Sequence, residues 1–353
     1  MTIIVTGGAG FIGSNFIHKW ISRNNELVIN FDKLTYAGNL DNLDAVRNKP
    51  DYSFVKGDIG DSKLIFKILE QYRPRAVINF AAESHVDKSI LSPQEFVETN
   101  IVGTFNLLEV IKNFFYSLNK TEKNSFRFLH VSTDEVYGSL EPSDLPFDEL
   151  HPYRPNSPYS ASKASSDHIV RAYFHTFGVP VITSNCSNNY GPFQFPEKLI
   201  PLCINNALSG KSLPIYGDGQ QIRDWLFVED HCDALCRILE SGTPGEVYNI
   251  GGNNEVRNLD VVTEICSVLD LLTHSSGESS FSDQIVFVED RKGHDARYAI
   301  NSKKIQNELG WMPKETFRTG LVKTVKWYLE NVDWLEKVSV RNRMDVEIKH
   351  DEA

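Results

Sequence analysis

The sequence has no long hydrophobic run and no surplus of basic residues. None of its apolar stretches reaches the roughly 18 residues that a membrane-spanning helix requires, so we expect no membrane partner. The formal net charge of −11 over 353 residues argues against a nucleic-acid partner, because proteins that bind nucleic acids carry basic surfaces. A small anionic substrate is still compatible with this charge if a few Lys and Arg side chains converge locally.

Cysteine is scarce, and its spacing matches neither a zinc site nor a redox motif. Cys232 and Cys236 would share a helix face, but two ligands do not make a metal site. We therefore predict no metal and a reducing compartment in which all five thiols are buried and unbridged: Cys186, Cys203, Cys232, Cys236 and Cys266. The first predicted strand begins at residue 2 with no targeting segment before it, so the expected location is cytoplasmic.

A glycine-rich turn near the N-terminus predicts a nucleotide site. The β-branched run at residues 3–6 leads into Gly7-Gly8-Ala9-Gly10-Phe11-Ile12-Gly13, and an amphipathic run over residues 14–21 follows. In such a strand–turn–helix unit, Gly7 permits the tight turn, Gly10 lets a pyrophosphate approach, and Gly13 lets the helix pack closely. The next apolar run ends at Asp32, about 20 positions further on, where a carboxylate binds the adenosine ribose and repels a 2′-phosphate. The predicted cofactor is NAD rather than NADP.

Apolar runs then alternate with helix-compatible stretches, at residues 27–31, 53–56, 76–81, 127–131 and 179–183. This rhythm predicts an α/β fold with a doubly wound parallel (Rossmann) sheet and a smaller C-terminal substrate-binding portion. The alternation stops near Asn185, and residues 246–250 are expected to return to the sheet as a strand. We expect an NAD-binding domain at 1–185 with a return segment at 226–256, a substrate portion at 186–225 and 257–330, and a loosely held tail at 331–353.

Three features allow two interpretations each. Asp58 could meet the adenine amino group, or it could cap the helix that starts near Ser62. His85 could be structural or catalytic. Residues 96–110 and 167–177 are apolar around much of their circumference, so these helices are either buried or paired in a dimer.

A catalytic group follows the strand predicted at 127–131. Thr133 comes just after this strand, and Tyr159 and Lys163 lie four positions apart in a helix-compatible stretch, hence on one helix face. An ammonium beside a phenol lowers the phenol's pKa from its usual value of about 10. Such a tyrosine can take a proton from an alcohol while hydride leaves for NAD, and Thr133 can hold the same oxygen. The alternative is two solvent-facing helix residues, which the nearby dinucleotide motif disfavours.

With these motifs the chain resembles the extended short-chain dehydrogenase/reductase family, and within it the dTDP-glucose 4,6-dehydratases. The resemblance runs from residue 3 to about residue 327 and is carried by residues 32–40, 81–87, 132–138, 185–192, 223–225 and 291–295. The Tyr-x-x-x-Lys pair belongs to the whole superfamily. The Thr133-Asp134-Glu135 triplet is narrower, because epimerases of similar fold lack the two adjacent acids.

The resemblance implies an NAD-dependent hydro-lyase, with Thr133, Asp134, Glu135, Tyr159 and Lys163 as its catalytic residues. Oxidation at C4 of the glucose makes the C5 proton acidic, Glu135 removes that proton, and Asp134 protonates the departing C6 hydroxyl. Two carboxyl groups in one pocket separate their pKa values, as an acid/base pair requires. Hydride then returns to C6, which gives dTDP-4-dehydro-6-deoxyglucose and regenerates NAD on the enzyme.

The resemblance also implies two sets of binding residues. Those for NAD are Gly7, Gly10, Phe11, Ile12, Gly13, Asp32, Lys33, Thr35, Asp58, Ile59, Ala81, Ala82, Ser84, Thr99, Tyr159, Lys163 and Asn189. Those for dTDP-glucose are Ser84, His85, Thr133, Asn188, Lys198, Leu199, Pro214, Tyr216, Arg223, Asn258, Arg291 and His294. Arg223 and Arg291 suit a diphosphate because guanidinium makes bidentate contacts, and Tyr216 offers a stacking surface for the base.

Some alternatives stay open at this point. Lys198 could equally be an ordinary surface residue, and Lys292 stands where the family most often has proline, which puts the stiffness of that loop in doubt. The function could be that of another nucleotide-sugar 4,6-dehydratase or a 4-epimerase, although Asp134 and Glu135 disfavour the epimerase. A non-catalytic NAD sensor would not need the catalytic residues. The expected assembly is a homodimer joined through a helical bundle.

Overall fold

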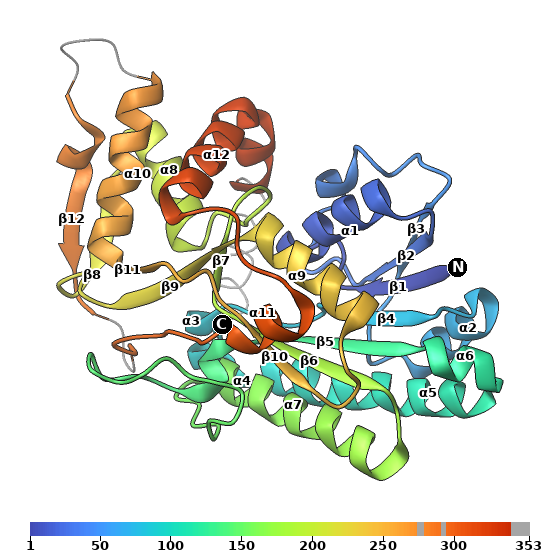
Figure 1. The fold of residues 1–353 in the computed structure, drawn as a ribbon. Coiled ribbons are helices and arrows are strands. Elements are labelled where there is room, and N and C mark those ends of the chain that lie inside the picture. The colour runs from blue at the N-terminus through green and yellow to red at the C-terminus, as the bar shows by residue number, and fades with distance from the viewer. Residues whose placement is uncertain (274–278, 291–293, 340–353) are drawn as a thin grey trace.

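A seven-stranded parallel sheet forms the centre of the computed structural model, which describes residues 1–273, 279–290 and 294–339 (Figure 1). Its strands are β1 (Thr2–Thr6), β2 (Leu27–Asp32), β3 (Tyr52–Lys56), β4 (Ala76–Asn79), β5 (Arg127–Thr133), β6 (Val181–Cys186) and β10 (Val247–Ile250). They lie in the order β10-β6-β5-β4-β1-β2-β3, and each neighbouring pair runs parallel. The order reverses between β1 and β4, where a ligand crevice is expected at the carboxyl ends of the strands. The prediction of a doubly wound parallel sheet is confirmed.

Helices cover both faces of this sheet, and the alternating side chains of β1 show how. Ile3 and Val5 lie in a buried cluster with α1 (Phe11–Arg23) and α9 (Val228–Ser241). Ile4 points the other way, into a cluster with α2 (Ser62–Tyr72), α5 (Thr104–Ser117) and α7 (Pro158–Phe177). A strand buried on both faces has a continuous apolar sequence, which explains why β1 lacks polar alternation. Figure 1 shows the helices on the two faces of the sheet.

Helix ends are set by local sequence signals. The side chain of Asp61 accepts hydrogen bonds from the backbone amides at the start of α2, so the capping interpretation of Asp58 is wrong. α7 begins with a capping box at Ser157 and with Pro158 in its first turn. It ends at Gly178, whose φ of +67° is the left-handed conformation that favours glycine. The helix that carries Tyr159 and Lys163 therefore has sharply defined ends.

The chain between β4 and α5 contains an irregular helical stretch. It runs through α3 (Val86–Leu91), α4 (Pro93–Phe96) and a π-helical segment, η2 (Val97–Gly103). The buried side chain of Asn100 in η2 bonds the backbone N–H and C=O of Glu83 and donates to Ser162 on α7. This segment therefore fixes the loop after β4 against α7. π-Helical turns often occur at functional sites.

A smaller part packs beside the carboxyl ends of the sheet. β9 (Ile222–Phe227) pairs with β7 (Asn188–Tyr190) and β11 (Glu255–Arg257), and β8 (Leu213–Tyr216) pairs with β12 (Ile285–Val288). α8 (Leu199–Leu208), α10 (Asn258–Thr273) and α12 (Phe317–Glu330) share a second buried core with these strands. β11 thus joins the smaller part although its first two residues fall in the expected return segment at 226–256. Conversely, α11 (Lys303–Leu309) places Ile305 in the core of the main sheet.

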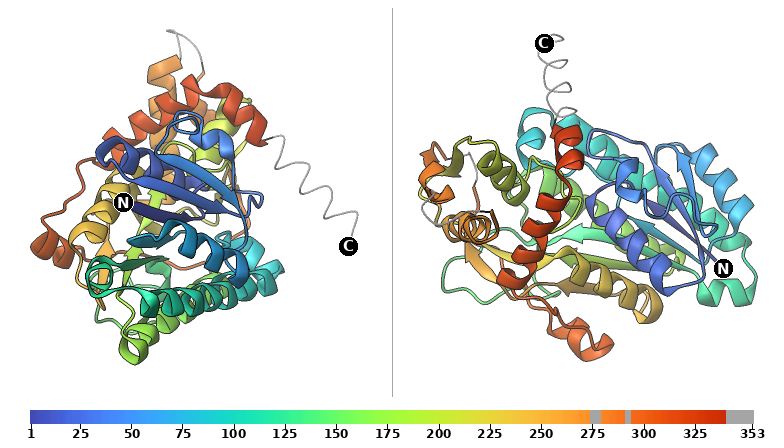
Figure 2. Two further views of the ribbon diagram at one scale, coloured as in Figure 1. Left: turned by 90° about the vertical axis from the view of Figure 1, so that its right-hand side faces the viewer. Right: turned by 90° about the horizontal axis from the view of Figure 1, so that it is seen from above.

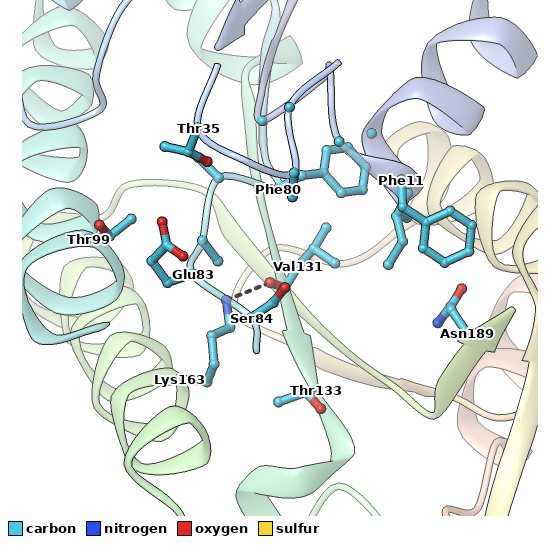
Figure 3. A pocket seen from close by; sticks show the side chains of 18 of the residues that line it. Phe11, Thr35, Phe80, Glu83, Ser84, Thr99, Val131, Thr133, Lys163 and Asn189 are labelled. Carbon is cyan, nitrogen blue, oxygen red and sulfur yellow. Dashed lines mark hydrogen bonds between the residues drawn. The ribbon is translucent and has the colours of Figure 1, made fainter. Parts of the chain in front are cut away.

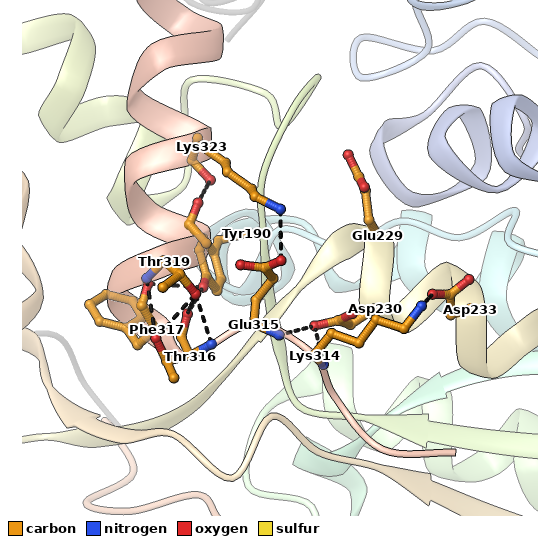
Figure 4. A network of polar contacts seen from close by, with 12 residues as sticks. Tyr190, Glu229, Asp230, Asp233, Lys314, Glu315, Thr316, Phe317, Thr319 and Lys323 are labelled. Atoms are coloured by element: carbon orange, nitrogen blue, oxygen red, sulfur yellow. Dashed lines mark hydrogen bonds and ion pairs between the residues drawn. The ribbon is translucent and has the colours of Figure 1, made fainter. Parts of the chain in front are cut away.

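The two parts are tied together around two aspartates on α9. Asp233 contacts Lys19 and Arg23 of α1 at 2.8 and 2.7 Å and Lys314 at 3.0 Å. Asp230 accepts hydrogen bonds from the backbone amides of Lys314 and Glu315 (Figure 4). The connection that leads into α12 is therefore held on the helix layer of the sheet.

The segment after α12 differs from the expected loose tail. Residues 332–339 are helical, and Trp334, Leu335 and Val338 are buried in the second core. The Trp334 Nε1–H donates to Asn42 Oδ1 at 2.9 Å, which joins this helix to the N-terminal half. Seen from above, these last helices (red) run between the α10 side and the α1 side of the molecule (Figure 2). In the sequence these three apolar residues lie at helical spacing among charged neighbours, so the segment as a whole appears polar. Residues 340–353 lie outside the described part.

The remaining described elements are short: α6 (Lys120–Ser125) and the 3₁₀ segments η1 (Leu40–Leu43), η3 (Asp134–Tyr137) and η4 (Phe281–Gln284). All five cysteines are buried and unbridged, as predicted. Within the described ranges, no helix is long and apolar enough to span a membrane. The same residues contain no cluster of three or more His, Cys, Asp or Glu side chains suited to a metal ion.

Candidate active site

A cavity of about 310 Å³ opens where β1, β2, β4, β5 and β6 end (Figure 3). Every position that the resemblance implies for NAD lies in its wall, and so do all five implied catalytic residues. These residues come from loops, helices and strand ends that are far apart in the sequence. The parallel sheet gathers them because the carboxyl ends of its strands meet at one edge.

The glycine turn forms one wall and leaves no room for side chains. A Cβ on Gly7 would lie 2.6 Å from the backbone nitrogen of Ala81, and Gly7 has a φ of +68°. A Cβ on Gly13 would lie 2.4 Å from the carbonyl oxygen of Gly7. Gly10 has only one such neighbour, at 3.3 Å, so its Cα is open on the cavity side. This cradle at the start of α1 fits the pyrophosphate of a dinucleotide.

The carboxylates beside β2 and β3 define the other end of the cavity. Asp32 accepts hydrogen bonds from the amides of Ala9 and Leu34 at 2.9 and 2.8 Å, although burial raises its pKa. Asp58 pairs with Lys33 at 2.7 Å. Burial opposes ionisation of Asp58, but the hydrogen bonds from Lys33 and from a backbone amide outweigh it and lower its pKa. Both acids fit an adenosine ribose and its base.

The opposite end holds the catalytic candidates. Thr133 is the last residue of β5, and its hydroxyl caps η3 by accepting from the Glu135 amide at 3.3 Å. Tyr159 lies in the first turn of α7 and hydrogen-bonds Thr133. One turn later, the Lys163 ammonium donates to the carbonyl of Val131 at 2.9 Å (Figure 3). A hydroxyl, a phenol and an ammonium thus meet at the end of one strand.

The acidity of Tyr159 differs from the prediction. Burial raises the pKa of this phenol well above its ordinary value, the charge of Glu135 raises it further, and the hydrogen bond with Thr133 opposes them. Lys163 is bonded to the Val131 carbonyl instead. The expected lowering of the phenol's pKa by Lys163 is therefore wrong for this state of the site, because a fully buried phenol beside carboxylates resists ionisation.

Asp134 differs from an ordinary surface aspartate in its burial and in its pKa. It is fully enclosed, and burial raises its pKa well above the usual range, with further increases from the charges of Glu135 and Asp224. The nearby guanidinium of Arg223 only partly offsets this effect. These surroundings favour the neutral carboxylic acid form of Asp134, which can donate a proton, while the adjacent Glu135 is half-exposed to the cavity.

Comparison with known proteins agrees with this geometry. A family model described as GDP-mannose 4,6 dehydratase matches residues 4–324. A dTDP-glucose 4,6-dehydratase of Xanthomonas campestris pv. campestris is 55% identical over 337 residues, which cover 96% of this chain and 95% of that one. The chain belongs to the dTDP-glucose 4,6-dehydratase family.

Two crystal structures of this family superpose over nearly the whole chain. The dTDP-glucose 4,6-dehydratase of Streptomyces venezuelae with NAD and dTDP bound has a TM-score of 0.87 at 43% identity and covers 96% of this chain and 100% of its own. The enzyme of Bacillus anthracis in complex with NAD has a TM-score of 0.85 at 47% identity, with coverages of 96% and 99%. NAD is the cofactor of this dTDP-glucose 4,6-dehydratase family member.

The substrate positions of the dTDP-glucose 4,6-dehydratase resemblance fall into two groups. Ser84, Thr133, Asn188 and Lys198 line the cavity, and the Lys198 ammonium donates to the Ser84 carbonyl at 2.9 Å. The others do not line it: His85 lies at the start of α3 in the main part, and the rest belong to the smaller part, namely Leu199, Pro214, Tyr216, Arg223, Asn258 and His294. Arg291, with its neighbour Lys292, lies outside the described residues.

Three of these outlying residues have clear local partners. Arg223 is buried, donates to the carbonyls of Ile222 and Asp295, and stacks over the ring of Tyr298. His85 caps α3, and burial lowers its pKa, which supports a structural role for this imidazole. Tyr216 is 44% exposed and meets the ring of His294 edge-on. The exposed face of Tyr216 is free to accept a base by stacking.

Sequence reasoning missed several residues of the cavity wall, including Glu83, Cys186, Gln194, Phe195 and Glu197. Glu197 accepts from the hydroxyl of Tyr36 at 3.0 Å and from Lys88 at 3.4 Å. Lys88 also lies 3.2 Å from the centre of the Tyr36 ring. These contacts link the loop after β2 with the loop before α8. Their members are far apart in the chain, so no local pattern could reveal them.

Proposed function

We propose that this protein converts dTDP-glucose into dTDP-4-dehydro-6-deoxyglucose while its NAD is reduced and reoxidised within one turnover. The observation that carries this function is the pair Asp134 and Glu135 in the same cavity as Thr133, Tyr159 and Lys163. Oxidoreduction at C4 needs only the last three. Elimination of water needs two further groups, a neutral acid and a carboxylate base, and Asp134 and Glu135 can supply them.

Each catalytic residue in the cavity has a separate proposed role. NAD, when bound, accepts hydride from C4 and returns it to C6. Tyr159 would take the proton of the C4 hydroxyl as a phenolate, a form that the positive charges of Lys163 and of bound NAD would favour over the neutral phenol of the cofactor-free site. Thr133 would bond the same C4 oxygen. Glu135 removes the C5 proton, and Asp134 gives its proton to the C6 hydroxyl, which leaves as water.

The cofactor would be held by the residues already described. The open Cα of Gly10 and the free amides at the start of α1 would receive the pyrophosphate. Asp32 would bind the adenosine ribose, and Asp58 would face the adenine. The remaining implied positions surround the same cavity and would enclose the nicotinamide end.

The nucleotide half of the substrate would extend from the cavity toward the smaller part. Asn188 and Lys198 stand at the cavity wall, and Tyr216, Asn258 and His294 would bind the thymidine end. The charge of Arg223 acts on Asp134 at the cavity wall, so its guanidinium is suited to the diphosphate of the substrate.

The expected homodimer has support from surface composition. Val97 and Val102 of η2 and Phe105 of α5 are each more than 40% exposed. A cluster of large apolar side chains on two consecutive helical segments fits a subunit interface. Among the described residues, the exposed large apolar side chains include none from α7, so the face would be built mainly by residues 97–105. A cytoplasmic location is proposed because the five thiols are unbridged.

The direct test is turnover of three sugar nucleotides by the purified protein: dTDP-glucose, UDP-glucose and GDP-mannose. A 4-keto product, detected by its absorbance in alkali, is expected from dTDP-glucose at the highest kcat/KM. Equal or better turnover of GDP-mannose or UDP-glucose would assign the enzyme to another 4,6-dehydratase. Formation of a C4 epimer without a keto product would overturn the proposal.

A further inference from the structure

A buried aspartate lies directly behind the catalytic candidates. Asp167 follows Lys163 by one turn of α7, so the two side chains share a helix face. Asp167 is 4% exposed, and its carboxylate faces the end of β5. One oxygen accepts from the hydroxyl of Ser132 at 2.8 Å, and the other lies 3.3 Å from Nε2 of His130.

The neighbours of Asp167 decide what its charge does. His130 is fully buried, and burial followed by the charge of Lys163 lowers its pKa, so it is a neutral imidazole at neutral pH. Its two ring nitrogens lie within 3.2 Å of Asn79 and Ser166. Tyr137 and Tyr153 also face Asp167, and burial raises the pKa of both phenols. None of these neighbours brings a positive charge.

Among the described residues, Lys163 is the cation whose charge is coupled to that of Asp167, from one turn earlier on the same face of α7. Burial lowers the pKa of the Lys163 ammonium, and the charge of Asp167 opposes that effect. Cys186 of β6 also faces Lys163, but burial raises the pKa of this thiol to about 12, so it is neutral. A buried ammonium without a counter-ion would lose its proton.

We propose that Asp167 is a positioning residue of the active site, acting as the counter-ion of the Lys163 ammonium and as a clamp between α7 and β5. Two contacts form the clamp. Lys163 donates to the carbonyl of Val131, and Ser132 donates to Asp167, so two successive residues of β5 are tied to two successive turns of α7. The next residue of the strand is Thr133. The register between Thr133 and Tyr159 therefore depends on this clamp, and the inference rests on the proposed function of that pair.

The test compares two substitutions in the NAD-loaded enzyme. Asp167→Asn keeps the shape and an acceptor for Ser132 but removes the charge. Lys163 then loses its proton at lower pH, so the alkaline limb of the kcat profile moves down by about one pH unit, and kcat at neutral pH falls about tenfold or more. Ser132→Ala removes one contact and keeps the charge, so its alkaline limb stays at the wild-type pH whatever the loss in rate. An unshifted alkaline limb in Asp167→Asn overturns the proposal.

A second measurement needs no substrate and separates this inference from the proposed function. Lys163→Met leaves the Asp167 carboxylate buried without its cation and lowers Tm. Adding Asp167→Asn to that variant removes the uncompensated charge, so the double variant is more stable than Lys163→Met alone. A double variant that is no more stable overturns the counter-ion role. Absence of turnover in the wild type would instead contradict the proposed function and leave this stability cycle interpretable.

Discussion

The neighbouring acids Asp134 and Glu135 have different surroundings, and this difference supports the different roles proposed for them. Asp134 is enclosed, and burial raises its pKa, whereas Glu135 is half-exposed and lines the cavity. Only a neutral carboxylic acid can give a proton to a leaving hydroxyl, and only a carboxylate can take the C5 proton. Burial of one member of an adjacent pair therefore fixes the direction of proton flow.

Replacing Glu135 with Gln separates oxidation from elimination. The amide keeps the shape of the side chain but cannot accept the C5 proton, so product formation falls by about 10²–10⁴-fold. Oxidation at C4 does not use Glu135, so the variant should stall with NADH and a 4-keto-hexose bound. NADH absorbance that persists after mixing with dTDP-glucose is the expected signal. A Glu135→Gln enzyme that forms product at the normal rate would sink this mechanism.

The Tyr159→Phe enzyme should be blocked at the first step, the oxidation at C4. Without the phenol oxygen no group takes the C4 hydroxyl proton, so oxidation and all later steps slow together by about 10²–10⁴-fold. Unlike Glu135→Gln, this variant should show no build-up of NADH absorbance. A rate within a few-fold of the wild type would assign the C4 proton to another group.

Asp224 makes stability depend on pH. Burial raises the pKa of this carboxyl to about 6, because the enclosing side chains outweigh the hydrogen bonds from the Asn253 and Asn254 amides and from Ser187. The folded protein therefore binds a proton that the unfolded chain has released between about pH 4 and pH 6. This group makes the free energy of unfolding fall as pH rises through that window. The Asp224→Asn variant lacks this contribution. In denaturant titrations between pH 4 and pH 7, its free energy of unfolding should therefore fall less with rising pH than that of the wild type. Identical pH dependence in both proteins would contradict the assignment.

At the scale of elements, much of the main part was predictable. The run into Gly7, the box at Ser157 with Pro158, and the glycine at 178 are local signals, and each sits where the structure has a strand end or a helix end. The cavity could be anticipated because parallel strands bring their following loops to one edge. Contacts between distant segments could not be predicted from the sequence, because Tyr36 meets Glu197 and Ser132 meets Asp167 only in the folded chain. The acidity of Tyr159 was mispredicted for the same reason, because burial is a property of the whole site.

The helix at residues 332–339 yields a stability prediction. Trp334 packs against the rings of Phe193, Trp327 and Tyr328 and donates to Asn42. Trp334→Ala would empty this space and leave the Asn42 oxygen without its donor, at a cost of about 3 kcal/mol or more in the free energy of unfolding. The matched control is Lys337→Ala on the exposed side of the same helix, which should change stability by less than about 0.5 kcal/mol. Equal denaturation midpoints for the two variants would contradict the packing role of the ring.

The whole molecule combines a strongly negative net charge with an exposed apolar surface on the η2–α5 segment. The charge of −11 opposes non-specific association, so a stable contact between copies requires a defined apolar patch. Val97, Val102 and Phe105 provide such a patch beside the segment that also carries Thr99 into the cavity wall. A partner covering this patch would also brace the cofactor site.

Phe105→Glu tests that assembly. Placing a carboxylate in the proposed apolar interface costs the desolvation of that carboxylate. Light scattering at micromolar concentration should therefore show a monomer for this variant and a dimer for the wild type. Leu271→Glu is the matched control, because Leu271 is 71% exposed at the end of α10 in the smaller part and its substitution should leave the dimer intact. If the η2–α5 interface braces the cavity, the Phe105→Glu monomer should also release NAD faster than the control. A stable wild-type monomer would show that no such dimer forms. A Phe105→Glu variant that is still dimeric would place the subunit contact on another surface.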